Sequence, residues 1–261
     1  MATRPDLVDV LGYPVNAISW GEVLNLLEEW SKGRQSRFAC LCNTHVIMTA
    51  RSNATLDRAI RDADLRLPDG MPIAILMRFS SGRDQQRIAG PDLMWRYCAN
   101  AERSGQSIFL LGSTTDTLEG LKLRLENAFP ALRIAGYHSP PFRAMTEEED
   151  RYLVELINRS GAHTIFVALG CPKQEIWMSE HRGLINGVMV GVGAAFDFHA
   201  GVVPRAPIWM QNVGLEWFHR LLAEPRRLWR RYLIINVQFA GIVFWRGMFG
   251  KLRDKRRATD A

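Results

Sequence analysis

The sequence predicts an α/β protein: a Rossmann-like, mostly parallel sheet with helices on both faces, followed by a helical C-terminal appendage. Short apolar runs alternate with segments of helical periodicity from about residue 38 to residue 196, which is typical of parallel strands joined by helical crossovers. Past Gly201 the composition changes to a segment rich in Trp and Arg. We therefore expect an α/β core over residues 1–205 and a basic amphipathic appendage over residues 206–261.

The individual elements follow from periodicity and from capping residues. Short apolar runs bounded by turn residues predict buried strands at residues 38–42, 108–111, 132–135, 164–169 and 187–192. Helical periodicity predicts helices at residues 46–63, 113–129, from Thr146 onward, and 174–181. Right-handed crossovers place the ligand site of such a sheet outside the carboxyl ends of its strands.

The net charge of +6 is concentrated at one end of the chain. From Glu216 to the end there are eleven Lys and Arg against four Asp and Glu, a net charge of +7, which leaves −1 for residues 1–215. A nearly neutral core offers no basic surface for wrapping duplex DNA, so we expect no nucleic-acid partner. The basic appendage needs a local anionic partner instead.

Residues 232–245 are uncharged and mostly apolar, and arginines flank them on both sides. As a helix they would extend about 21 Å at ~1.5 Å per residue, which is short of a hydrocarbon core of about 30 Å. Nearby aromatic residues favour a helix that lies in the interface of an anionic membrane. The alternatives are an amphipathic helix packed on the core with a solvated basic end, and a site for single-stranded nucleic acid.

Cysteine usage and the absence of long apolar runs indicate the compartment. The four cysteines show neither a disulfide framework nor paired zinc-ligand spacing, which fits a reducing environment. The N-terminal residues lack an apolar leader, and no run reaches the roughly 18 apolar residues of a membrane span. We therefore expect a cytoplasmic protein that is peripheral to a membrane.

Three residues could carry chemistry, two near the ends of predicted strands and Asp69 directly after a strand-like segment at residues 65–68. Asp69 lies in the turn Pro68-Asp69-Gly70, where a carboxylate could act as a general base; the alternative is an ordinary Asp-Gly turn. Gly112 opens a strand-to-helix turn whose free amides could hold a nucleotide phosphate or ribose. Gln174 could bind a sugar hydroxyl with both halves of its amide, although the position also suits a helix N-cap region.

Other motifs are incomplete. Asp62-Ala63-Asp64 has a pattern that can hold a divalent cation, but it falls at the end of a predicted helix, and Asp197 with His199 lacks a third ligand. Gly191-Val192-Gly193 resembles the opening of a dinucleotide fingerprint, yet Phe196 stands where the third glycine should be. Walker A and Gly-x-Ser-x-Gly motifs are absent, which argues against P-loop and classical serine hydrolase chemistry.

Short stretches between residues 43 and 231 occur in a characteristic order: Asn43, Pro68-Asp69-Gly70, Arg87-Ile88-Ala89-Gly90-Pro91-Asp92-Leu93, Phe109-Leu110-Leu111-Gly112, Gly170-Cys171-Pro172-Lys173-Gln174-Glu175, Gly191-Val192-Gly193-Ala194-Ala195-Phe196-Asp197, Arg205-Ala206-Pro207, Gly214-Leu215-Glu216-Trp217-Phe218-His219-Arg220 and Glu224-Pro225-Arg226-Arg227. Together they resemble the WecG/TagA/CpsF glycosyltransferase family, glycosyltransferase family 26. The ordered combination favours a functional Asp69 over a simple turn.

The resemblance implies an inverting glycosyltransferase of cell-surface polysaccharide biosynthesis. Such an enzyme transfers a sugar from a UDP-sugar donor to a polyprenyl (undecaprenyl) diphosphate-linked sugar acceptor, at the inner face of the bacterial cell membrane. It needs no metal or other cofactor. The site residues that the resemblance implies are Asp69 as the base, Asn43, Arg87 and Gln174 in the sugar site, and Arg220, Arg227 and Arg230 closing over the donor's diphosphate.

Two departures from the family pattern leave the substrates open. Leu41 stands where relatives often carry Thr, and Thr44-His45 replaces a Pro-Glu pair. The donor sugar is therefore either of the N-acetylmannosamine type or a hexose such as glucose. A noncatalytic nucleotide-binding protein of the membrane surface is the main alternative, and a nicotinamide-dependent oxidoreductase is disfavoured by the incomplete glycine fingerprint. A homo-oligomer is compatible with the sequence.

Overall fold

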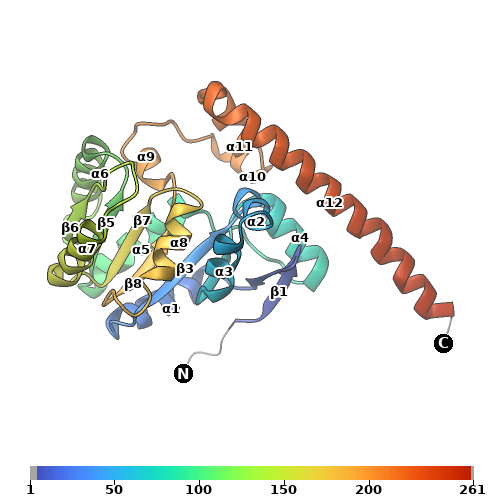
Figure 1. Ribbon diagram of the computed structural model, residues 1–261, viewed down its shortest axis with the longest axis horizontal. Coiled ribbons are helices and arrows are strands. Elements are labelled where there is room, and N and C mark those ends of the chain that lie inside the picture. The colour runs from blue at the N-terminus through green and yellow to red at the C-terminus, as the bar shows by residue number, and fades with distance from the viewer. Residues whose placement is uncertain (1–4, 260–261) are drawn as a thin grey trace.

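The computed structural model describes residues 5–259, apart from the side chains of Arg227, Arg231 and residues 246–259. Its centre is a six-stranded sheet in which every strand pair is parallel, in the order β4-β3-β8-β7-β5-β6 (Figure 1). The strands are β3 (Arg37–Cys42), β4 (Leu65–Pro68), β5 (Ser107–Gly112), β6 (Arg133–His138), β7 (Thr164–Ala168) and β8 (Val188–Gly191). The predicted mostly parallel sheet is therefore confirmed.

Helices cover both faces of this sheet, as the sequence predicts. Alternate residues of β5 point to opposite sides, so that Ile108 and Leu110 join one apolar cluster while Phe109 and Leu111 join another. The first cluster lies under α1 (Trp20–Lys32), α5 (Gly90–Ser104), α6 (Thr115–Ala128) and α9 (Ala195–His199). The second lies under α7 (Glu147–Ser160) and α8 (Lys173–Glu180).

The single helix expected at residues 46–63 is wrong in detail, because the structure has two helices there. α2 (Thr44–Ala50) ends before a turn, and α3 (Ala54–Asp62) begins after Asn53. The Asn53 side chain accepts a hydrogen bond from the Leu56 amide at 3.0 Å, so it starts a new helix within the apolar pattern. The broken pair lets α2 begin directly at the end of β3.

Several further parts of the fold, α1 among them, were not among the expected elements. A hairpin of β1 (Leu7–Val10) and β2 (Tyr13–Asn16) forms a separate antiparallel sheet. It packs with α2, α3 and α4 (Met71–Ser81) around a third apolar cluster. α4 and α5 also carry the chain from β4, at one edge of the sheet, past three strands to β5.

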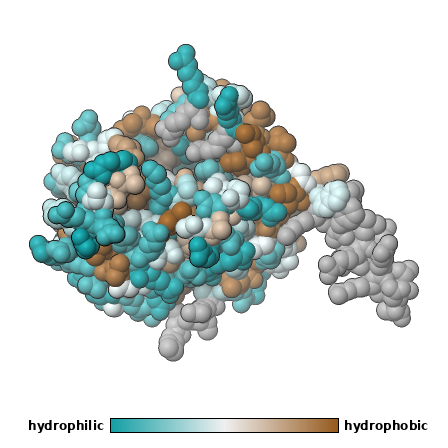
Figure 2. Space-filling model, viewed as in Figure 1, coloured by the Kyte–Doolittle hydropathy of each residue, from teal (hydrophilic) through white to brown (hydrophobic). Residues whose placement is uncertain are grey.

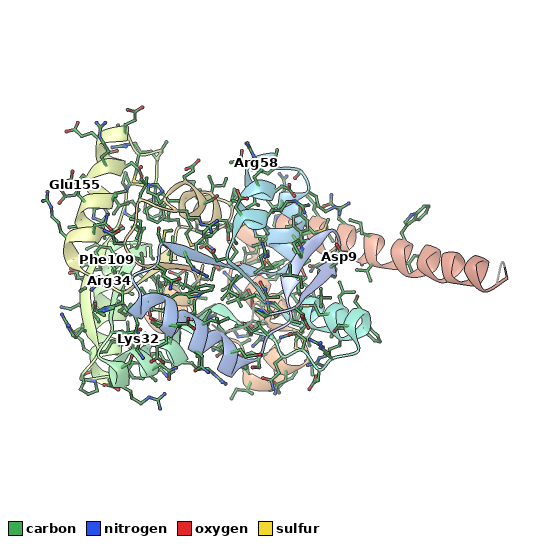
Figure 3. The ribbon with its side chains drawn as sticks, turned by 90° about the horizontal axis from the view of Figure 1, so that it is seen from below. Asp9, Lys32, Arg34, Arg58, Phe109 and Glu155 are labelled. Atoms are coloured by element: carbon green, nitrogen blue, oxygen red, sulfur yellow. The ribbon has the colours of Figure 1, made fainter. Side chains whose placement is uncertain are left out.

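The C-terminal segment is helical, as expected. It consists of α10 (Ile208–Asn212), α11 (Glu216–Ala223) and the 35-residue α12 (Pro225–Thr259). The middle of α12 packs on α2 and on the third apolar cluster through Phe239, Ile242 and Val243. Beyond this contact α12 extends past the core as an arm (Figures 1 and 3). Among the described residues, no helix combines the length and the apolar character needed to cross a bilayer.

Candidate active site

A cavity of about 1290 Å³ lies at the carboxyl ends of the parallel strands, where the fold class predicts a ligand site. The segments that follow β3, β4, β5, β7 and β8 form its floor and walls, and α11 and α12 complete it from the appendage side. Single ligands of drug size usually occupy about 300–1,000 Å³. The cavity is thus large enough for two substrates side by side.

Asp69 and Asn43 meet on the floor of the cavity. Asp69 follows β4, and its amide donates to the carbonyl of Cys42 at 3.1 Å, which extends the pairing of β4 with β3. Asn43 caps α2 by accepting from the Val46 amide at 3.0 Å. Its Nδ2 atom then donates to Oδ2 of Asp69 at 3.0 Å. Two strand ends therefore fix the carboxylate, with its other oxygen Oδ1 left for chemistry.

The surroundings of Asp69 make it more basic than an ordinary aspartate. Burial raises its pKa most strongly, because a charged carboxylate is poorly solvated there. The hydrogen bond from Asn43 and the positive charge of Arg87 lower the pKa in part, whereas Glu216 and Asp92 raise it. A raised pKa improves a carboxylate as a proton acceptor at neutral pH.

Gln174 reaches the same cavity from the first turn of α8. It is only 4% exposed, and its backbone amide donates to the carbonyl of Gly170 at 2.9 Å. Its Nε2 atom donates to Oε1 of Glu175 at 2.7 Å, while its own Oε1 atom is buried and has no hydrogen-bond partner in the structure. Gln174 therefore presents an unused acceptor among the lining residues.

Arg87 also lines the cavity, but one ion pair and one hydrogen bond join it to the appendage. Its Nη1 atom lies 2.6 Å from Oε2 of Glu216 on α11, and Nη2 donates to Oε1 of Gln211 on α10 at 3.1 Å. The side chains of Arg87 and Glu216 are 12% and 19% exposed, so this pair is well shielded from water. Arg87 is thus a joint between core and appendage as well as a wall of the cavity.

Two further residues extend this joint. Arg205 donates to both carboxylate oxygens of Asp92, at 2.7 and 2.8 Å, and its Nε lies 3.7 Å from Glu216. Burial opposes ionisation of Asp92 most strongly, but the hydrogen bonds from Arg205 and the positive charges of Arg205, Arg87 and Arg96 together hold the pKa of Asp92 below its usual range. We call Arg87, Asp92, Arg205 and Glu216 the ion-pair cluster. It carries two positive and two negative charges and is therefore balanced.

The other predicted ligands lie in different surroundings. Arg220 lines the cavity, with its guanidinium 5.4 Å from the ring centroid of Phe198 and its Nε buried without a hydrogen-bond partner. Arg230 is exposed and lies over the ring of Trp229, outside the cavity lining. The side chain of Arg227 is outside the described part of the chain. Of the two appendage arginines whose side chains the structure describes, Arg220 thus lies at the cavity and Arg230 does not.

Gly112 contributes a close approach of strands and is not itself part of the cavity lining. Its φ is +118°, and a Cβ there would meet the carbonyl oxygen of Ala168 on β7 at 2.5 Å. The residue after it, Ser113, also has a positive φ, of 58°, and lines the cavity together with Thr114. Gly112 therefore gives the backbone the conformation that places Ser113 and Thr114 at the cavity.

Besides Ser113, which belongs to the turn predicted to hold a nucleotide, the cavity lining includes Glu216, Tyr232 and Phe239, which were not anticipated as ligands. Ser113 Oγ donates to Oδ1 of Asp197 at 3.3 Å on the cavity wall. Tyr232 and Phe239 of α12 add an aromatic wall, and Glu216 holds Arg87. Glu216 lies in the stretch that resembles the family, but its role depends on a contact over 129 positions that no local pattern reveals.

The weak metal motifs are occupied by other contacts. Asp64 lies at the opposite end of the sheet, where it accepts from the Phe38 amide and pairs with Arg182 at 2.9 Å. His199 turns away from Asp197, bonds the carbonyl of Pro91 at 2.9 Å and stacks on Trp95. Within residues 5–259, as far as their side chains are described, no group of three or more His, Cys, Asp or Glu could hold a metal ion.

Comparison with known proteins identifies the family. Residues 8–253 match the model of the "Glycosyl transferase WecG/TagA/CpsF family". The chain belongs to this family. The match spans both the sheet and most of the appendage, so the resemblance drawn from separate stretches is confirmed. As a member of the WecG/TagA/CpsF family, the chain is a glycosyltransferase of the hexosyltransferase type.

Two curated relatives share the name N-acetylglucosaminyldiphosphoundecaprenol N-acetyl-beta-D-mannosaminyltransferase. The protein of Bacillus subtilis strain 168 is 34% identical over 195 residues, which are 74% of this chain and 73% of the relative. The protein of Bacillus spizizenii strain W23 is 33% identical over 199 residues, 76% of this chain and 75% of the relative. These WecG/TagA/CpsF members are similar over most of both lengths.

Proposed function

We propose that this chain is an inverting transferase that moves a sugar from a UDP-sugar to a polyprenyl-diphosphate-linked sugar in cell-surface polysaccharide biosynthesis. The observation that carries the proposal is the Asp69 carboxylate, hydrogen-bonded by Asn43 on the floor of a cavity with room for two substrates. The names of both relatives support an acceptor of this kind. The donor sugar is of the N-acetylmannosamine type, with a hexose such as glucose as the alternative.

Asp69 is the general base of the proposed reaction. Its free oxygen takes the proton of an acceptor hydroxyl while the hydroxyl oxygen forms a bond to the anomeric carbon of the donor. The bond from that carbon to the UDP diphosphate breaks on the opposite side, and the electron pair leaves with UDP. One bond forms as one breaks from the other face, so the configuration of the sugar inverts.

The departing diphosphate needs positive charge, and the appendage supplies it. Guanidinium groups bind phosphates through paired hydrogen bonds and keep their charge at any physiological pH. Arg220 lies at the cavity with an unused Nε, and we assign it to the diphosphate. Arg227 and Arg230, on the first two turns of α12, are proposed to join it when the donor binds. The reaction then proceeds without a metal.

The surface of the appendage supports a peripheral position on an anionic membrane at the inner face of the cell membrane. One side of α12 packs on the core, whereas Leu233, Val237, Phe244 and Trp245 are between 59% and 70% exposed. Figure 2 shows apolar residues gathered over the first half of α12, where the arm leaves the core. Exposed apolar residues beside basic ones are typical of a membrane-interface helix, which would bring the cavity to a lipid-linked acceptor.

A transfer assay tests the proposal. Purified protein is given UDP and GDP sugars with a short-chain polyprenyl-diphosphate sugar, with and without EDTA. We expect transfer from one UDP-sugar that survives EDTA, with an inverted anomeric configuration by NMR. Asp69→Asn should lower the turnover at least 1,000-fold without weakening UDP or vesicle binding, whereas the exposed Asp116→Asn should have no effect. Full activity of Asp69→Asn would reject Asp69 as the base.

A further inference from the structure

Glu175 holds the side-chain amide of Gln174 by a hydrogen bond, although Glu175 itself does not line the cavity. Glu175 is 0% exposed and is not part of the cavity lining. Its Oε1 atom accepts from Nε2 of Gln174 at 2.7 Å. Gln174 itself is 96% buried, and its Oε1 atom has no hydrogen-bond partner in the structure. Such a buried, unused acceptor costs free energy unless a ligand supplies a donor.

The orientation of the Gln174 amide follows from the chemistry of its neighbour. An ionised carboxylate can only accept hydrogen bonds, so the NH2 group of Gln174 must face Glu175 and the carbonyl must face the other way. Burial raises the pKa of Glu175, and in the neutral acid Oε1 still accepts when the proton is on Oε2. When Glu175 is ionised, the reverse orientation would place two acceptor oxygens against each other at 2.7 Å.

The backbone of two glycines approaches the Gln174 amide closely. A Cβ at Gly191, the last residue of β8, would lie 3.1 Å from Nε2 of Gln174 and 2.7 Å from the Met178 methyl. A Cβ at Gly193 would lie 4.0 Å from Oε1 of Gln174, so this oxygen lies beside the cavity-lining Gly193. The amide is held between a glycine at the strand end and the Glu175 carboxyl.

We propose that Glu175 is a positioning residue that fixes the Gln174 carbonyl toward the cavity, so that the sugar site demands a hydrogen-bond donor, a hydroxyl or an amide N–H, from the transferred sugar. This inference rests on the proposed function and deepens it. Glu175 acts through Gln174 and does not touch the substrate. Sites that hydrogen-bond a substrate group reject analogues without it because the buried partner is left unpaired.

Substitution of Glu175 by Gln tests the positioning role with the full-length protein. The amide introduced at position 175 can donate as well as accept, so Gln174 loses its fixed orientation at almost unchanged volume. By calorimetry, we expect the affinity for UDP-N-acetylmannosamine, or UDP-glucose if that is the donor, to fall about tenfold, while the affinity for UDP stays the same. Glu155→Gln, an exposed surface change, is the control and should alter neither.

A double-mutant cycle asks whether the effect passes through Gln174. Gln174→Ala should lower the same affinity, and addition of Glu175→Gln to it should cost nothing further. Equal losses for UDP and UDP-sugar, no loss with either UDP-sugar, or additive losses would each overturn the proposal. If the wild-type protein shows no sugar transfer in the transfer assay, the proposed function is rejected instead. Failure of the positioning role and failure of the proposed function are therefore distinguishable.

A second measurement does not depend on the folding of a Glu175 variant. Donor sugars in which one hydroxyl is replaced by fluorine, or the acetamido N–H by an ester oxygen, keep an acceptor but lose a donor. Wild-type protein should bind one such analogue about tenfold more weakly, and Gln174→Met should no longer discriminate against it. If every analogue binds wild type like the natural sugar, the cavity-facing carbonyl selects no donor and the inference is wrong.

Discussion

The α/β core and the appendage are held together in different ways. Apart from the partly exposed edge strand β6, the strands of the sheet are almost entirely inaccessible to water and pack in apolar clusters. Among the described side chains of residues 206–245, only Ala206, Gln211 and Leu228 are buried. The appendage is attached mainly by the ion-pair cluster and by a few apolar contacts of α12. The core should therefore tolerate loss of the appendage, whereas the active site should not.

Removal of the appendage is the strongest way to separate the two regions. Truncation after residue 205 should lower transfer to a lipid-linked acceptor by more than about 1,000-fold, because Arg220 and the α12 wall are lost together. Circular dichroism should still show a folded α/β protein with a cooperative thermal transition. A truncated protein with full activity on this acceptor would contradict the assigned role of the appendage.

A matched pair of phenylalanines compares how the two regions are stabilised. Phe166→Ala, in the middle of β7 and 0% exposed, should lower the free energy of unfolding by about 3–5 kcal/mol. Phe244→Ala, on α12 and 70% exposed, should change it by less than about 0.5 kcal/mol. In sedimentation with anionic vesicles the larger effect should come from the other variant: Phe244→Ala should bind vesicles more weakly than Phe166→Ala does. Unchanged vesicle binding would count against the membrane face of α12.

The ion-pair cluster can be weakened without removal of either region. Glu216→Gln keeps the shape of the side chain and removes the charge facing Arg87, so kcat/KM should fall about tenfold, near the lower end of the 1.5–3 kcal/mol typical of charged hydrogen bonds. Glu155→Gln breaks an exposed pair with Arg159 and should change kcat/KM by less than twofold. Equal effects would mean that the cluster does not join appendage and site.

The smallest expected effect concerns stability and pH. Burial raises the pKa of Asp69 in the folded protein, so the folded state binds its proton more tightly than the unfolded state does. The stability that this proton binding adds to the folded state is fully present below the pKa of Asp69 in the unfolded chain. It is lost as the pH rises through the pKa of Asp69 in the folded protein. Asp69→Asn should therefore be more stable than wild type at pH 8, by about 1 kcal/mol or less, and this gain should vanish toward pH 4 in denaturant titrations. A gain that grows at low pH would contradict the raised pKa.

The sequence predicts the core better than the joint between the two regions. Buried parallel strands are continuous apolar runs, so β3, β5, β7 and β8 can be located without a structure. Asn43 and Gln174 follow two of these strands and Asp69 follows the shorter β4, so their convergence is a consequence of the fold class. The break at Asn53 could not be separated from a continuing helix, because its cap acts within an unbroken apolar pattern.

Contacts between distant segments account for what the sequence does not show. The pairs Arg87–Glu216 and Arg205–Asp92 join residues more than 100 positions apart. The hydrogen bond from Gln174 to Glu175 joins neighbours in sequence, but the sequence does not show which of the two residues lines the cavity. That Arg230 lies outside the cavity lining likewise depends on how α12 is placed against the core.

The central place of β8 has a consequence for synthesis of the protein. β8 pairs with β3 on one side and β7 on the other, although about 150 residues of chain separate it from β3. Until β8 has left the ribosome, β3 and β7 each present an unpaired edge, and edges of this kind recruit other chains. Long-range parallel pairing is also slow. The nascent chain thus passes through an aggregation-prone stage that ends only when its last strand inserts.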